Sequence, residues 1–252
     1  MSVDEAMTSA SVVASTHRLL VTEKDAVGLY RPVGFLDARE RSEGTAYSFA
    51  YLRAAVERED FRPLLGFADR QRTYRSEGLF PLFAERVMDP RRPDHPVFLA
   101  ALDLTSDASP LEVLSRSGGQ RAGDGIMLLP VPVVDVDGDT SCVFLVHGVR
   151  YVDGAENRIA QLQAGDALSL APDRANPVNA RALLVTEAGG EPLGFVPDAL
   201  LDFVHLVQAP RITVVRVNGP EVGTRLRLLV RLSGAADPDV QPFTGPEWHT
   251  VA

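Results

Sequence analysis

The stretch "LQAGDALSLAPDRANPVNARALLV", residues 162–185, holds two short apolar runs joined by a loop that contains Asn176-Pro177. Proline restricts φ, and asparagine side chains hydrogen-bond to nearby backbone, so this loop is expected to be stiff. A second glycine- and proline-bearing segment, "GGEPLGFVP" at residues 189–197, follows directly. Two interpretations stay open at this point: a turn of a small barrel, and a loop that faces a ligand.

The segment around this loop has the pattern of an all-β domain. Six strand-like runs lie close together with turn signals between them, at residues 142–152, 165–172, 180–188, 191–197, 211–218 and 224–232. A helical turn at residues 157–163 and a short amphipathic helix at residues 197–207 interrupt them. Many short strands with little helix predict a small closed barrel over residues 135–232. Its last hairpin is expected at residues 211–232.

The preceding part, residues 17–134, mixes strand and helix signals. Strands are predicted at residues 17–21, 27–38 and 45–51, and a buried strand at residues 125–134. Leu79, Phe83 and Val87 form one apolar stripe and predict a helix over residues 78–88. A second apolar helix is expected at residues 97–104. This part is therefore predicted to be an α+β domain.

Local signals mark one further helix and both ends of the chain. Ser109, Pro110 and Glu112 form a capping box with proline at the first helical position, and Gly118 follows as a stop signal. Residues 1–16 are small and polar and are expected to be disordered. Residues 233–252 form an acidic, proline-rich tail.

Composition limits the classes of function. The 252 residues carry a net charge of −9, which argues against a protein that coats nucleic acid by bulk electrostatics. Residues 145–232 carry no net charge, since their nine arginines balance nine acidic residues, so this part of the chain repels an anion least. The single cysteine, Cys142, excludes an internal disulfide. No signal peptide and no apolar run of about 20 residues is present, so a cytoplasmic protein without a membrane segment is expected.

Residues from about 144 to 207 resemble a HIRAN domain, a module of some DNA-repair helicases and of stand-alone bacterial proteins. The matching pieces are "HGVRYVDG", "LQAGDALSLAPDRANPVNARALLV" and "PLGFVP", in this order. The resemblance implies an OB-like barrel that captures the 3′ end of single-stranded DNA. It implies an aromatic ring that stacks on a terminal base and polar groups that hold the terminal nucleotide.

The resemblance suggests a set of nucleic-acid-binding residues. Arg150 and Tyr151 match a basic–aromatic pair, in which arginine contacts phosphate and the ring stacks on a base at about 1–3 kcal/mol. If the run at residues 142–152 is one continuous strand, these two side chains face opposite sides. Asn176 is expected to cap the loop backbone. The remaining candidates are His147, Arg174, Asn179, Arg181 and Phe195.

The Asn-Pro loop departs from the family at two positions. Where the family reads Asn-Pro-Tyr-Asp, this chain has Val178 and Asn179. Valine cannot stack on a base, and a neutral amide replaces a carboxylate that lies near the terminal hydroxyl. Asn179 keeps the capacity to hydrogen-bond a 3′-hydroxyl.

The first part, from about residue 27 to residue 130, resembles the N-terminal subdomain of HipA-type toxin kinases. The matching pieces are "FAYLRAA", "RPLLGF", "LFPLFAERVM" and "PLEVLSRSGGQRAGDGIMLLP". The kinase core of that family does not follow here, because the chain continues into the barrel. The resemblance implies contact with a partner protein, for example a kinase-like toxin, a helicase or a nuclease.

Catalytic and metal chemistry have no identifiable centre in the sequence. The five histidines are far apart, no glycine-rich phosphate loop with a lysine is present, and no serine has a nucleophile context. A non-enzymatic binding protein without cofactor or metal is therefore expected. It would engage single-stranded DNA or DNA 3′ ends and dock a protein partner in a toxin–antitoxin, defence or DNA-repair context. The alternative is a protein-interaction or antitoxin-like module that no longer binds DNA.

Overall fold

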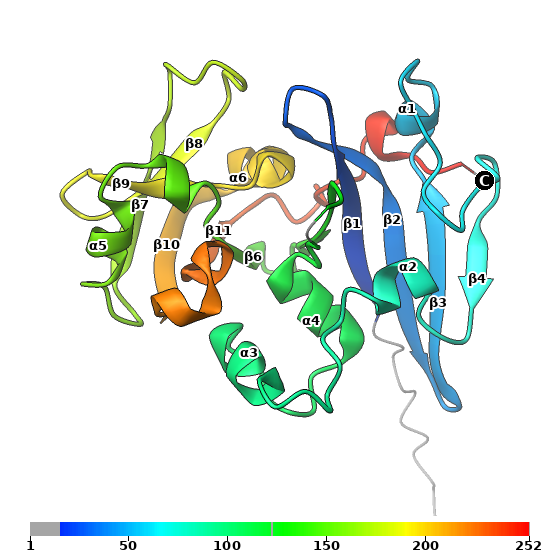
Figure 1. The fold of residues 1–252 in the computed structure, drawn as a ribbon. Coiled ribbons are helices and arrows are strands. Elements are labelled where there is room, and N and C mark those ends of the chain that lie inside the picture. The colour runs from blue at the N-terminus through cyan, green and yellow to red at the C-terminus, as the bar shows by residue number, and fades with distance from the viewer. Residues whose placement is uncertain (1–15, 122, 252) are drawn as a thin grey trace, which may run out of the picture.

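Two antiparallel sheets make up most of the molecule (Figure 1). The computed structural model describes residues 16–121 and 123–251. The first sheet has the order β4-β3-β2-β1-β5. Its strands are β1 (Thr16–Lys24), β2 (Tyr30–Arg41), β3 (Gly44–Tyr51), β4 (Tyr74–Ser76) and β5 (Ile126–Pro130). The strands expected at residues 17–21, 27–38 and 45–51 are thus confirmed.

The turn between β1 and β2 is held by one aspartate. Asp25 Oδ1 accepts hydrogen bonds from the backbone N–H groups of Val27 at 3.0 Å and Leu29 at 2.9 Å. Its Oδ2 accepts from Arg31 Nε at 2.8 Å. An aspartate that bonds the backbone two and four residues ahead holds a turn in one conformation. This turn matters for function because it forms part of the cleft described below.

The helices of the first half are short: α1 (Arg53–Val56), α2 (Pro81–Ala84), α3 (His95–Ala101) and α4 (Pro110–Ser117). The predicted capping box of α4 is confirmed, since Glu112 N donates to Ser109 Oγ at 3.3 Å and Ser109 N donates to Glu112 Oε2 at 2.7 Å. Gly118 ends the helix with φ 72°. The molecule as a whole consists mainly of antiparallel sheets with short helices. The assignment of the first half to the α+β class stays a prediction.

The helix predicted over residues 78–88 is confirmed only for its middle turn. Beyond Ala84 the chain makes tighter bonds three residues apart, from Arg86 N to Phe83 O and from Val87 N to Ala84 O, each at 3.1 Å. The guanidinium of Arg86 is buried, and it donates to Gly119 O at 3.0 Å and to Asp124. Because this tertiary anchor holds the segment, the apolar stripe does not extend into a longer helix.

The second sheet is barrel-like and has the order β6-β11-β10-β7-β8-β9. Its strands are β6 (Asp139–Leu145), β7 (Ala167–Pro172), β8 (Leu183–Thr186), β9 (Pro192–Phe195), β10 (Gln208–Val217) and β11 (Leu228–Ala235). The predicted last hairpin is confirmed by the pairing of β10 with β11, for example Ile212 opposite Leu232. The helices α5 (Ala155–Ile159) and α6 (Leu201–Leu206) lie where helical segments were expected.

A backbone bridge between His147 and Phe195 closes the curved sheet into a ring. His147 N donates to Phe195 O at 2.9 Å, and Phe195 N donates to His147 O at 2.8 Å. Gly194 permits this approach, because a Cβ at that position would lie 2.5 Å from His147 O. The prediction of one continuous strand over residues 142–152 is wrong. β6 ends at Leu145, Gly148 turns the chain with φ 69°, and a short 3-10 helix η1 (Val149–Tyr151) follows.

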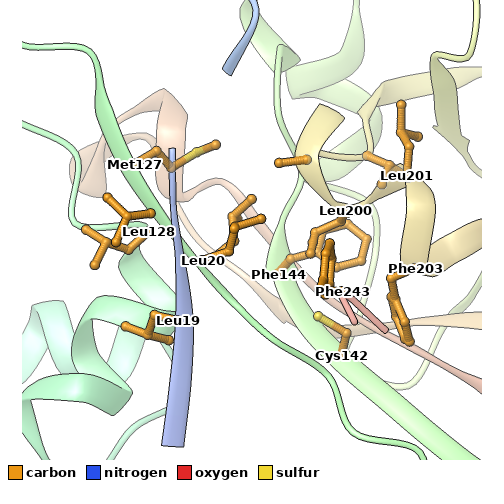
Figure 2. Close-up of a cluster of buried hydrophobic side chains, with 14 of the residues drawn as sticks. Leu19, Leu20, Met127, Leu128, Cys142, Phe144, Leu200, Leu201, Phe203 and Phe243 are labelled. Carbon is orange, nitrogen blue, oxygen red and sulfur yellow. The ribbon is translucent and has the colours of Figure 1, made fainter. Parts of the chain in front are cut away.

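Both halves share one hydrophobic core (Figure 2). Leu19 and Leu20 of β1 lie on one side of this core, and Phe144 of β6 lies on the other with Phe203 of α6. Leu102, just after α3, packs against Leu145 and Leu229 on the barrel strands. Because the two halves bury apolar side chains against each other, the cleft between them has rigid walls.

The segment after β11 returns to the first sheet. Arg53 N donates to His249 O at 2.8 Å, and Val251 N donates to Tyr51 O at 2.9 Å. Phe243 and Val251 are buried, and the ring of Trp248 lies 6.2 Å from that of Phe35. The acidic, proline-rich tail therefore completes the fold of the first half. The N-terminal segment is predicted to be disordered, and its residues 1–15 lie outside the described part of the chain.

Candidate functional site

A cleft of about 1220 Å³ lies between the mouth of the barrel and the first half of the chain. The first half contributes the β1–β2 turn with residues 24–30, the segment at residues 85–89 and the end of α4 with residues 115–121. The barrel contributes residues 144–151, the Asn-Pro loop, residues 195–198 and residues 222–226. The cleft is thus built from loops and strand ends held by the shared core.

The lining of this cleft is cationic although the chain is acidic. Its acidic residues are three, Glu85, Asp89 and Asp198, whereas its basic residues are seven: Lys24, Arg86, Arg92, Arg116, Arg121, Arg150 and Arg225. The lining therefore carries a formal charge of +4, against −9 for the whole chain. A concave surface of one sign concentrates ligands of the opposite sign, so this cleft favours an anion.

Some of these cations are neutralised by ion pairs. Arg86 pairs with Asp124 at 2.6 Å, Arg121 with Glu85 at 2.7 Å and Arg92 with Asp94 at 2.7 Å. The other four basic residues form no ion pair with any carboxylate in the described part of the chain: Lys24, Arg116, Arg150 and Arg225. The positive charge that remains free to attract an anion in the cleft comes from these four side chains.

Arg150 and Tyr151 lie together at the mouth of the barrel. The continuous strand that would place them on opposite sides is not formed, because both belong to η1, where successive side chains do not alternate across a sheet. Arg150 Cζ lies 4.6 Å from the centroid of the Tyr151 ring, and Arg150 Nη2 donates a hydrogen bond to Tyr151 Oη. The Tyr151 side chain is 71% exposed. The pair presents a charged group and an aromatic ring to solvent as one unit.

His147 faces the first half of the chain across the cleft. Its ring centroid lies 6.5 Å from that of Tyr30, the first residue of β2. Burial, and to a smaller extent the positive charge of Arg225, lowers the pKa of His147 to about 4. Its imidazole is therefore neutral near pH 7, a wall residue without a charge of its own. Burial raises the pKa of Tyr30, while the charges of Arg225 and Arg150 oppose this rise.

The Asn-Pro loop is stiffened by its own side chains, as predicted. Asn176 Oδ1 accepts hydrogen bonds from Val178 N at 3.0 Å and Asn179 N at 2.9 Å, and its Nδ2 donates to Asp173 at 3.1 Å. Asn179 Oδ1 accepts from Arg181 N at 2.9 Å, and its Nδ2 donates to Asp198 Oδ1 at 2.7 Å. Both amides thus shape the loop and leave Val178, half exposed, at the cleft.

The remaining predicted residues are divided between the cleft and the outer surface. Phe195 lines the cleft, and its ring covers Gly148, where a Cβ would lie 2.8 Å from Phe195 Cδ2. Arg181 pairs with Asp202 at 2.7 Å, and neither Arg181 nor Arg174 lines the cleft. The cleft therefore brings together six of the eight residues singled out from the sequence, namely His147, Arg150, Tyr151, Asn176, Asn179 and Phe195.

Three residues that reach the cleft from elsewhere were not predicted from the sequence. Lys24 and Tyr30 come from the first half. Arg225 comes from a 3-10 helix η4 (Thr224–Leu226), where the sequence pattern predicts the start of a strand. No local pattern marks them, since their proximity depends on how the two halves pack. The one available signal was that Lys24 is the sole lysine of the chain.

No group of three or more His, Cys, Asp or Glu side chains is placed to hold a metal ion in residues 16–121 and 123–251. No helix within the same ranges has the length and apolar character to cross a membrane.

Comparison with solved structures finds partial likenesses. The crystal structure of a protein from Lactobacillus plantarum is 20% identical, covering 40% of this chain and 100% of that chain, with a TM-score of 0.31. The crystal structure of the HIRAN domain of human HLTF is 18% identical, covering 42% of this chain and 85% of that chain, with a TM-score of 0.30. No protein-family model and no curated protein matches the sequence. At these TM-scores the likenesses assign no function.

Proposed function

We propose that this chain is a binding protein that engages single-stranded DNA, or the 3′ ends of DNA, at the mouth of its barrel. The observation that carries the proposal is a cleft lined by four basic residues that form no ion pair within the described ranges, in a chain of charge −9. Most of the affinity for nucleic acid comes from phosphate neutralisation, which needs local positive charge rather than a basic protein. The resemblance of residues 144–207 to HIRAN domains supports the same ligand.

The size of the cleft supports a polymeric ligand. Pockets for small molecules usually measure about 300–1,000 Å³. The cleft here, about 1220 Å³, exceeds that range and is bordered by a solvent-exposed ring, Tyr151. An unpaired strand has exposed base faces that such a ring can stack on, worth about 1–3 kcal/mol for each base. In this proposal Arg150 contacts phosphate while Tyr151 stacks on a base.

End recognition rests on a carboxylate at the mouth. Asn179 stands where the family has an aspartate, but its Nδ2 holds the Asp198 carboxylate at 2.7 Å, and Asp198 lines the cleft. A carboxylate accepts a hydrogen bond from a terminal hydroxyl and repels a terminal phosphate. Asp198 therefore takes the role of hydroxyl acceptor, and a free 3′ end is preferred over a phosphorylated one.

The wider role in this proposal is non-enzymatic. The first half docks a protein partner, such as a kinase-like toxin, a helicase or a nuclease, in a toxin–antitoxin, defence or repair context, and the barrel reads the DNA. The support for this part is the sequence resemblance of residues 27–130 alone.

A second candidate function is protein binding without DNA. It is favoured by Val178 at the position of a stacking ring, and by the use of both loop amides, Asn176 and Asn179, within the loop. In that case the cationic cleft would accept an acidic segment of a partner protein.

Fluorescence anisotropy tests the proposal directly. The probe is a labelled oligothymidylate of about 12 nucleotides, within the site size of OB folds, with a free or a phosphorylated 3′ end. Wild type is compared with Arg150→Gln, Tyr151→Leu and Tyr151→Phe. Binding is expected for wild type, weakened by the 3′ phosphate, by Arg150→Gln and by Tyr151→Leu, while Tyr151→Phe retains a stacking ring and most of the affinity.

Two outcomes would overturn the proposal. Folded wild-type protein that fails to bind the strand at about 50 mM salt would retire DNA as the ligand and leave the protein-binding candidate. Binding that is indifferent to Arg150→Gln and Tyr151→Leu would place the DNA elsewhere on the molecule.

A further inference from the structure

We infer that the two halves of the chain jointly form a phosphate-binding subsite around Tyr30, made by Lys24 of β1, Arg150 of η1 and Arg225 of η4. The ligand is a backbone phosphate of the strand. The inference deepens the proposed function and rests on it, because it adds a second wall to the cleft opposite the barrel mouth.

The groups converge on Tyr30 from both halves. Lys24 Nζ lies 6.0 Å from the centroid of the Tyr30 ring, and the His147 ring lies 6.5 Å away on the barrel side. Gln120 Nε2 donates to Tyr30 Oη at 3.4 Å. The short helices that carry Arg150 and Arg225 contact each other, so their side chains start from neighbouring backbone. The charges of Arg150 and Arg225 both act on the Tyr30 hydroxyl.

The positive charges of this cluster have no carboxylate partner in the described ranges, so they favour a bound anion. None of Lys24, Arg150 and Arg225 forms an ion pair with a carboxylate in the described ranges, whereas Arg31, one residue after Tyr30, is paired with Asp25 at 2.8 Å. His147 stays neutral near pH 7, so the positive charge of the cluster comes from the lysine and the two arginines alone. Three basic residues without an ion-pair partner line one cleft, and each of them attracts a bound phosphate.

The wall from the first half is preorganised. Lys24 N donates to Gly125 O at 2.9 Å, and Asp25 holds the following turn through two backbone hydrogen bonds. Tyr30 packs on the core that both halves share. The subsite therefore needs no large movement to bind, and only the tips of long basic side chains have to be ordered.

Salt dependence of binding tests the subsite. For single strands, log K falls with log salt with a slope of about −0.7 for each phosphate neutralised. The same labelled oligothymidylate is titrated with wild type, Lys24→Gln, Arg225→Gln and Arg39→Gln between about 50 and 200 mM salt. Arg39 is exposed on β2 and does not line the cleft, so Arg39→Gln is the matched control for loss of one charge.

The expected result is a slope that becomes shallower by about 0.7 in each of Lys24→Gln and Arg225→Gln, and an unchanged slope in Arg39→Gln. Lys24 and Arg225 are exposed, so both variants are expected to fold as wild type does. Suppose that wild type binds the strand and that Arg150→Gln weakens binding, but that Lys24→Gln and Arg225→Gln both keep the wild-type slope. The subsite is then refuted, and the proposed function stands. If wild type does not bind the strand, both fail together.

Photocross-linking gives an independent measurement. A strand that carries 5-iododeoxyuridine is irradiated with wild-type protein, and the modified peptides are mapped. Cross-links to Tyr30 as well as Tyr151 support a strand that passes between the two halves. Cross-links confined to the barrel would contradict the second wall.

Discussion

His147 and Phe195 exchange two backbone hydrogen bonds, with N···O distances of 2.9 and 2.8 Å, and thereby join the end of β6 to β9. The same two residues line the cleft. Closure of the barrel and construction of the binding wall are therefore one structural feature. Changes that loosen this bridge are expected to affect both the stability of the fold and the site.

Gly194→Ala tests the closure. The backbone of Gly194 has φ 156°, and a Cβ there would meet His147 O at 2.5 Å and Val146 Cγ1 at 2.6 Å. We expect a loss of roughly 2–4 kcal/mol in the free energy of unfolding, from backbone strain and a clash with main chain. Urea unfolding measures it. Gly189→Ala in the β8–β9 turn is the control and is expected to be nearly neutral, because an added Cβ would meet only Glu187 Oε1 at 3.6 Å, an ordinary contact.

Acid destabilisation is expected from His147. Its pKa is lowered from 6.5 to about 4 in the folded protein, chiefly by burial, so only the unfolded chain takes up a proton between these values. By linkage, the stabilisation is complete above pH 6.5 and is lost as the pH falls toward 4. At 1.36 kcal/mol for each unit, the loss is at most about 3.5 kcal/mol.

Unfolding of wild type and His147→Gln between pH 7 and pH 4 isolates this contribution, since the variant keeps every other titrating group. The stability of the variant should fall less steeply with acid. If the free energy of unfolding falls equally with pH in the two proteins, His147 does not cause the loss of stability between pH 7 and pH 4.

Phe243→Ala tests whether the segment after β11 belongs to the fold. Phe243 is 6% exposed, and its ring lies 4.7 Å from that of Trp248 in an edge-on contact. Truncation of a buried phenylalanine usually costs about 3–5 kcal/mol, and we expect a loss in that range by urea unfolding. Val240→Ala, at a side chain 42% exposed, should change stability by less than about 0.5 kcal/mol. If Phe243→Ala changes stability as little as Val240→Ala does, the segment after β11 is peripheral to the fold.

Asp198→Asn tests the selection of free 3′ ends. Removal of the carboxylate removes repulsion of a terminal phosphate, so the ratio of affinities for free and phosphorylated strands is expected to fall toward one. Asp202→Asn is a matched control, because Asp202 pairs with Arg181 outside the cleft. Anisotropy with both strands measures the ratio, and a ratio that Asp198→Asn leaves unchanged would exclude Asp198 as the discriminating group.

Local signals in the sequence were sufficient for many elements. The capping box of α4, the β10–β11 hairpin and the cap of the Asn-Pro loop by Asn176 were all predicted and are confirmed. Each depends on residues near in sequence, whose propensities and hydrogen bonds act over a few positions. The end of β6 was missed because the apolar pattern continues past Leu145, where Gly148 and the bridge to Phe195 turn the chain.

The sequence by itself determined the local elements, the stiff loop and the basic–aromatic pair of Arg150 and Tyr151. Only the tertiary structure decided that Arg174 and Arg181 lie outside the cleft and that Lys24, Tyr30 and Arg225 enter it. The physical reason is that contacts between distant segments carry no local signal. They form because Leu20 of β1 and Phe144 of β6 bury apolar surface in one core, and this packing sets which polar side chains meet at the rim.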